Sequence, residues 1–73
     1  MQYTISVVIR AGGLENALAR ILGMSSTVRI LYVRYDAPLW RVYLEAGDNA
    51  ELITSNAAYL PALEKLGLIE SFE

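Results

Sequence analysis

The sequence predicts an α+β domain in which four strands and two helices follow one another in the order β-α-β-β-α-β. Two observations predict this order. Residues 3–10 and 40–46 alternate apolar and polar side chains, as half-buried strands do. Residues 14–22 instead repeat their apolar side chains at helical spacing. The 73 residues suffice for one domain, which we expect to span residues 1–73.

A half-buried strand and an amphipathic helix come first. We expect the strand over residues 3–10. The glycine pair at positions 12 and 13 predicts a tight turn after it, because glycine relieves steric limits on the backbone. A helix follows over residues 14–22, and we expect Gly23 to cap its C-terminus. The apolar stripe of this helix consists of Leu14, Ala17, Leu18, Ile21 and Leu22.

The middle of the chain predicts a β-hairpin. Residues 27–35 are rich in β-branched and aromatic side chains, with apolar residues on both faces. Turn chemistry follows at residues 36–39, where Pro38 fixes its own φ angle. Residues 40–46 then alternate again, so the second and third strands should pair.

The second helix is predicted to begin near Asp48 and to be disturbed by Pro61. Asp48 followed by Glu51 resembles a capping box. Proline inside a helix removes one hydrogen bond and clashes with the preceding turn. We therefore expect either a kink, or a helix that ends near Ala58 and a new turn at Pro61.

A short final strand completes the order. Gly67 ends the second helix, and residues 68–72 form the strand. This order predicts a ferredoxin-like arrangement, an antiparallel sheet with two helices on one face. The other face of the sheet would be bare.

The composition predicts self-association. The chain is 55% hydrophobic and only 19% charged, which leaves little polar surface to cover a monomer of this size. We expect a homodimer or a higher homo-oligomer that buries the bare face of the sheet. The bare face would carry either Leu31, Val33, Tyr35 and Tyr43 or their neighbours, and the first set are the candidate interface residues.

The residue types present do not favour catalysis or a bound cofactor. The chain has no histidine and no cysteine, which excludes disulfides, a serine triad activated by histidine and the usual zinc and haem ligands. Glu45, Asp48 and Glu51 are close in sequence, but helix capping accounts for two of them. We therefore expect a non-enzyme with no cofactor and no metal.

The chain shows no apolar run long enough for a membrane helix and no signal peptide, so we expect a cytoplasmic protein that makes no membrane contact. Charge is unevenly distributed: residues 1–43 carry a net charge of +3, and residues 44–73 carry −5. This asymmetry fits a polarised solvated surface, head-to-tail contact between subunits, or an anion site lined by arginine.

Three stretches, residues 3–9, 13–24 and 63–72, resemble ACT domains, and among these the short small (regulatory) subunits of acetolactate synthase. The resemblance implies a regulatory module that dimerises, contacts a larger catalytic subunit and binds a small amino acid. The family binds its ligand at the loop between the first strand and first helix, where an Asp or Asn precedes a Pro-Gly pair. Here that loop lacks the acidic or amide residue, and Gly12 replaces the proline. The candidate ligand-binding residues are Arg10, Gly12, Gly13 and Leu14.

Two alternatives to a regulatory module stay open. The altered loop at residues 10–12 is consistent with a structural or self-assembling protein without any ligand. Tyrosines 32, 35 and 43 and Trp40 also interleave with arginines 29, 34 and 41, which is compatible with stacking on RNA. Because the net charge is −2 and the aromatic signature of RNA-recognition strands is missing, we do not expect nucleic acid as the partner.

Overall fold

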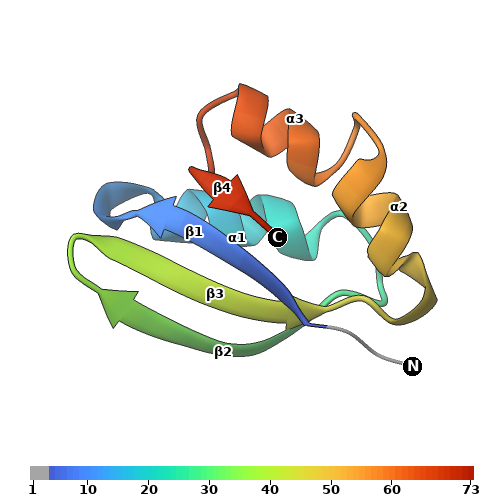
Figure 1. Ribbon diagram of the computed structural model, residues 1–73, viewed down its shortest axis with the longest axis horizontal. Helices are drawn as coiled ribbons and strands as arrows, with labels where there is room; N and C mark the ends of the chain where they lie inside the picture. The colour runs from blue at the N-terminus through green and yellow to red at the C-terminus, as the bar shows by residue number, and fades with distance from the viewer. Residues whose placement is uncertain (1–3) are drawn as a thin grey trace.

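The computed structural model describes residues 4–73 and contains one four-stranded antiparallel sheet with three helices packed against it (Figure 1). The strands lie in the order β2-β3-β1-β4. The elements are β1 (Ile5–Arg10), the 3₁₀ turn η1 (Ala11–Gly13), α1 (Leu14–Leu22), β2 (Arg29–Asp36), β3 (Leu39–Glu45), the 3₁₀ turn η2 (Gly47–Asn49), α2 (Ala50–Ser55), α3 (Leu60–Lys65) and β4 (Ser71–Phe72).

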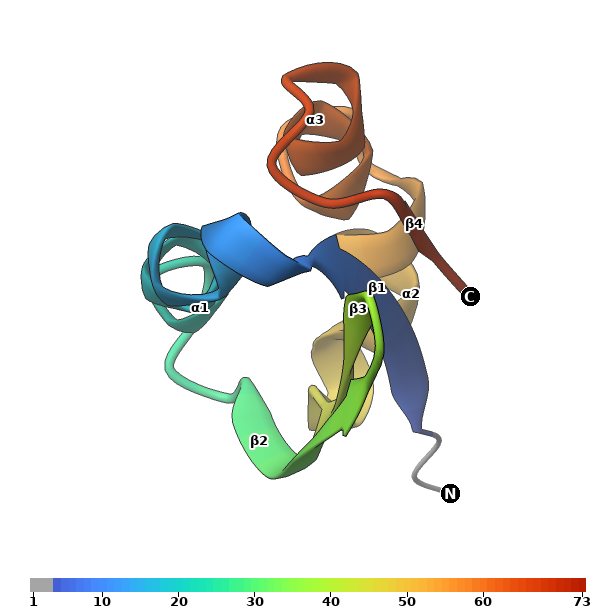
Figure 2. The ribbon, with the colours of Figure 1, turned by 90° about the vertical axis from the view of Figure 1, so that its left-hand side faces the viewer.

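The helices all contribute to one apolar core on one side of the sheet (Figure 2). Alternate residues of β1 and β3 point into this core, and all of them except the partly buried Trp40 are fully buried. In the described part of the chain, no buried side-chain nitrogen or oxygen lacks a hydrogen bond. The core residues from the sheet and the helices are Ile5, Val7, Ile9, Ala17, Ile21, Val42, Leu44, Ala50, Ile53, Leu60 and Leu63.

The strand registers assign each sheet residue to one of two faces. Val7 pairs with Val42, and Val33 also pairs with Val42, so these three valines share the face that the helices cover. We call this the covered face. The opposite side, the open face, carries Ser6, Val8, Arg10, Arg29, Tyr32, Arg34, Asp36, Leu39, Arg41, Tyr43, Glu45 and Ser71.

A β-bulge in β2 decides which face each of its residues joins. Ile30 pairs with Leu44, whereas Tyr32 pairs with Tyr43, so Leu31 is an extra residue without a partner in β3. One extra residue reverses the alternation of a strand, because successive side chains point to opposite faces. Beyond the bulge, Val33 therefore joins the covered face and Arg34 the open face.

The first helix lies where its spacing predicts, at Leu14–Leu22, and Gly23 caps it. The preceding strand begins at Ile5. The part of the predicted strand that includes Tyr3 lies outside the described residues. The predicted tight turn forms as η1, which runs directly into α1.

The second helical region is divided into α2 and α3, and Pro61 lies in the first turn of α3. The predicted interruption before Pro61 is confirmed, although α2 already ends at Ser55. The hydroxyl groups of Thr54 and Ser55 donate to backbone carbonyls of the preceding turn, which weakens the end of a helix. The Asn56 side chain then accepts a hydrogen bond from the Ala58 N–H and forms a turn.

The expected capping box is wrong. Asn49, not Asp48, precedes α2, and neither η2 nor α2 has a side-chain hydrogen bond at its N-cap. The chain instead enters α2 through the 3₁₀ turn, so Asp48 already lies within a helical turn and is exposed.

The end of α3 forms a Schellman motif around Gly67. The φ angle of Gly67 is +79°, in the left-handed region that favours glycine. The Gly67 N–H donates to the Glu64 carbonyl, and the Leu68 N–H donates to the Leu63 carbonyl. This reversal brings the chain back to β1, where Ser71 and Phe72 pair as the short strand β4.

Candidate functional site

The open face of the sheet gathers charged and aromatic side chains that are scattered along the sequence. Arg41 and Tyr43 alternate with the buried residues of β3, so the strand itself directs them to this face. In β2, the bulge directs Tyr32, Arg34 and Asp36 to the same side. The face therefore depends on both the alternation of β3 and the irregularity of β2.

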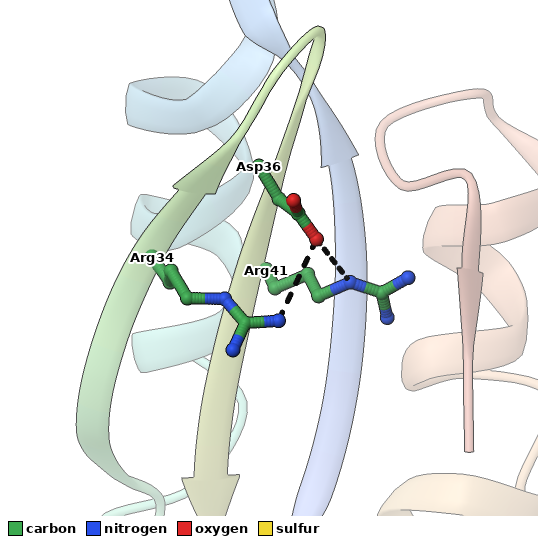
Figure 3. Close-up of polar contacts among 3 residues, drawn as sticks. All are labelled: Arg34, Asp36 and Arg41. Atoms are coloured by element: carbon green, nitrogen blue, oxygen red, sulfur yellow. Dashed lines mark hydrogen bonds and ion pairs between the residues drawn. The ribbon is translucent and has the colours of Figure 1, made fainter.

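Arg34, Asp36 and Arg41 form a cluster at one end of this face (Figure 3). The carboxylate of Asp36 accepts a hydrogen bond from Nε of Arg41 at 3.2 Å and another from a terminal nitrogen of Arg34 at 3.5 Å. One carboxylate thus serves two guanidinium groups, and the cluster keeps an excess of positive charge. In Figure 3 all three side chains lie in front of the strands, while α1 lies behind them.

Beyond Nε, the guanidinium of Arg41 extends across β1 toward β4 (Figure 3). There it lines a polar hollow together with Ser6, Ser71 and Glu73. Within residues 4–73, the terminal nitrogens of Arg41 make no hydrogen bond. Guanidinium N–H groups next to hydroxyl groups are donors of the type that bind phosphate or carboxylate oxygens.

Two tyrosines stack beside this cluster. The rings of Tyr32 and Tyr43 are 4.5 Å apart between centroids and are inclined by 20°. The guanidinium carbon of Arg34 lies 6.0 Å from the centre of the Tyr43 ring, within the range of a cation–π contact. Tyr32 remains about half exposed, at 53%.

A third arginine of the open face is held by an ion pair. Arg29 pairs with Glu45, whose residue is only 9% exposed, whereas most of the Arg29 side chain is exposed to solvent. The pair lies across β2 and β3, because Arg29 and Glu45 are direct partners in the sheet. It accounts for the burial of an acidic residue at the end of the open face.

The predicted ligand-binding residues lie together where β1 meets α1. Arg10 ends β1, and its side chain lies against Gly13, which is the N-cap residue of α1. Gly12 and Leu14 border an open apolar hollow that Trp40 also lines. The Trp40 Nε1–H donates to the carbonyl of Ala11 at 3.3 Å, which attaches this loop to β3.

The structure does not place the four predicted interface residues on one face. Tyr43 is on the open face, but Val33 and Tyr35 are on the covered face, and Leu31 is the extra residue of the bulge. A regular strand with Ile30 facing the core would have placed all four on the open face. The bulge therefore corrects the interpretation, although three of the four still share β2, at the edge of the sheet.

Residues 4–73 contain no group of three or more His, Cys, Asp or Glu residues that could hold a metal ion. Nor does any of their helices have the length and apolar character needed to cross a membrane. Comparison with protein-family models, with curated proteins and with solved structures found no match.

Sequence reasoning identified the interleaved tyrosines and arginines but missed the part played by Asp36. The pattern at residues 36–39 indicated a turn, and Asp36 was assigned only to that turn. Its position opposite Leu39, at the start of the hairpin, directs its carboxylate to Arg41. The alternation of residues 41, 43 and 45 was a usable signal, since it placed Arg41 and Tyr43 on one face.

Proposed function

We propose that this protein is a small regulatory or binding module that pairs with a second copy of itself through the exposed edge of β2. The observation that carries the proposal is the nature of this strand. β2 is eight residues long, lies at the edge of the sheet, and has no fully buried residue.

The edge strand β2 is long, and four of its exposed side chains are large and hydrophobic. Leu31, Tyr32, Val33 and Tyr35 are 42%, 53%, 36% and 53% exposed. An edge strand also presents unpaired N–H and C=O groups, which serve as a template for another strand. The opposite edge, β4, has only two residues. A second copy therefore finds its most favourable partner at β2.

Side-chain pairing favours one register for two antiparallel β2 strands. If Val33 lies opposite Val33 of the second copy, Tyr32 lies opposite Arg34, which permits a cation–π contact. A register centred on Arg34 instead sets two guanidinium groups directly opposite each other, which is unfavourable. We therefore infer the register centred on Val33, in an eight-stranded sheet made by two copies.

The element order and the strand order β2-β3-β1-β4 support a ferredoxin-like arrangement, and with it the resemblance to ACT domains. The proposed ligand is a small amino acid, with its carboxylate near Arg10 and the N–H groups that begin α1. Its apolar side chain would occupy the hollow beside Trp40. The proposed role is to modulate a larger catalytic subunit.

Dimerisation is tested by light scattering on a size-exclusion column over a range of protein concentrations. We expect the wild type to be a dimer. Val33→Lys should be a monomer, because the inferred register places two lysines opposite each other. Leu22→Lys is the matched control, since Leu22 is an exposed apolar residue of α1 and not of β2. A monomeric wild type, or equal behaviour of the two variants, contradicts the proposed interface.

Ligand binding is tested by isothermal titration of branched-chain amino acids into the dimer. The proposal expects binding that Arg10→Ala weakens and that Arg20→Ala leaves unchanged, since Arg20 lies on the exposed side of α1. A dimer that takes up no amino acid would instead support the self-assembling alternative, in which the loop at residues 10–13 is only a turn.

A further inference from the structure

We propose that the open face binds a single-stranded nucleic acid, with arginines holding phosphates and the tyrosine pair stacking on bases. This inference does not depend on dimerisation or on the amino-acid site. Its starting observation is that charge is separated between the two sides of the molecule.

The net charge of −2 conceals this separation. Of the six cationic side chains, three (Arg29, Arg34 and Arg41) lie on the open face, and Arg10 lies at its end. The other two, Arg20 and Lys65, lie on helices. Those helices and the turn before α2 carry Glu15, Asp48, Glu51 and Glu64, so the helical side has a net charge of −2. The open face also carries Asp36, Glu45 and Glu73, so its net charge, with Arg10 included, is +1. Electrostatic interactions would therefore favour the binding of an anionic polymer to the open face and disfavour its binding to the helical side.

Arg41 provides the best-defined phosphate contact. Asp36 fixes the position of its Nε, which orients the guanidinium and leaves the terminal N–H groups directed over β1 (Figure 3). The hydroxyl groups of Ser6 and Ser71 line the same hollow and add neutral donors. The carboxylate of Glu73 also lines it, so a phosphate bound there would lie close to one negative charge as well.

The tyrosine pair distinguishes a nucleic acid from other polyanions. Stacking on aromatic side chains is available to every unpaired base and is tolerant of sequence. Tyr32 is half exposed and already stacks on Tyr43, so a base placed on it continues an existing stack. Alternate residues of a strand are about 6.7 Å apart, so Tyr32 and Arg34 offer one base contact and one phosphate contact in succession. Bases of a duplex are not free to stack in this way.

The experiment measures fluorescence anisotropy of a labelled single strand of about 12 nucleotides, as RNA and as DNA, at about 50 and about 200 mM salt. We expect binding by the wild type that weakens as salt rises. The double variant Arg34→Ala, Arg41→Ala should bind at least about tenfold more weakly and show a smaller salt dependence. Its matched control is Arg20→Ala, Lys65→Ala, which removes the same charge from the helical side and should bind as the wild type does.

The aromatic contribution is measured separately. Tyr32→Leu should weaken single-strand binding about tenfold, whereas Tyr35→Leu, on the covered face of the same strand, should not. Three results would overturn the proposal: no binding at the lower salt concentration, equal losses in the two double variants, or no effect of Tyr32→Leu. Equal competition by polyglutamate or by duplex DNA would also overturn it and assign the face to acidic surfaces in general. Circular dichroism of each variant verifies folding before binding is compared.

Discussion

The two faces of the sheet are made by the same strands and differ in almost every property. On β1, Val7 is fully buried under the helices, while the adjacent Val8 lies on the open face and is half-buried. On β3, Val42 and Leu44 lie in the core, while Arg41 and Tyr43 project to the other side. One face thus supplies apolar burial, and the other presents chemistry to solvent. A period of two is what allows each of these short strands to serve both purposes.

The largest expected contrast is between neighbouring valines. Val7→Ala should lower the free energy of unfolding by about 2 kcal/mol, because it removes buried methyl groups and leaves a cavity. Val8→Ala makes the same chemical change on the open face and should cost less than about 1 kcal/mol. Urea denaturation of both variants measures the difference. Similar losses would mean that the open face is covered in solution, as it would be by a partner.

A second contrast concerns how the covering helices are joined to the sheet. Gly67→Ala should destabilise the protein by about 1 to 2 kcal/mol, because alanine in the left-handed region is strained. Gly12→Ala is the matched change, since its φ is not positive and an added Cβ meets nothing within 4 Å. Thermal unfolding of the two variants provides the measurement. If Gly67→Ala were neutral, the Schellman motif would not be needed to position β4.

A smaller contrast lies within the open face itself. Arg29→Met should cost about 1 kcal/mol, because it leaves the mostly buried carboxylate of Glu45 without its partner. Arg34→Met should cost less than about 0.5 kcal/mol, since Arg34 and Asp36 are both more than half exposed. Chemical denaturation at low salt compares them. Equal costs would indicate that the Asp36 cluster is structural rather than available to a ligand.

Much of the fold could be predicted from the sequence, because its signals are local. The stripe of α1, the alternation of β1 and β3, the hairpin turn at Pro38 and the interruption before Pro61 all depend on residues a few positions apart. The chain contains no comparable local signal for the bulge. It lies between Ile30, which pairs with Leu44 and packs against the core, and Tyr32, which pairs with Tyr43 on the open face. The candidate site could be predicted only in part for the same reason, since the bulge determines which residues of β2 join Tyr43.

Leu31 shifts the alternation of side chains along β2 by one residue. The residues of β2 after Leu31 lie on the faces opposite to those they would occupy if Leu31 itself were paired with β3. Arg34 therefore faces solvent and Val33 faces inward. Removing this single residue would make β2 a regular strand and would leave Tyr32, Arg34 and Asp36 on the open face, opposite the same partners in β3. The bulge therefore lets β2 hold one residue more than the strand opposite it, while Tyr32, Arg34 and Asp36 stay on the face that carries Arg41 and Tyr43.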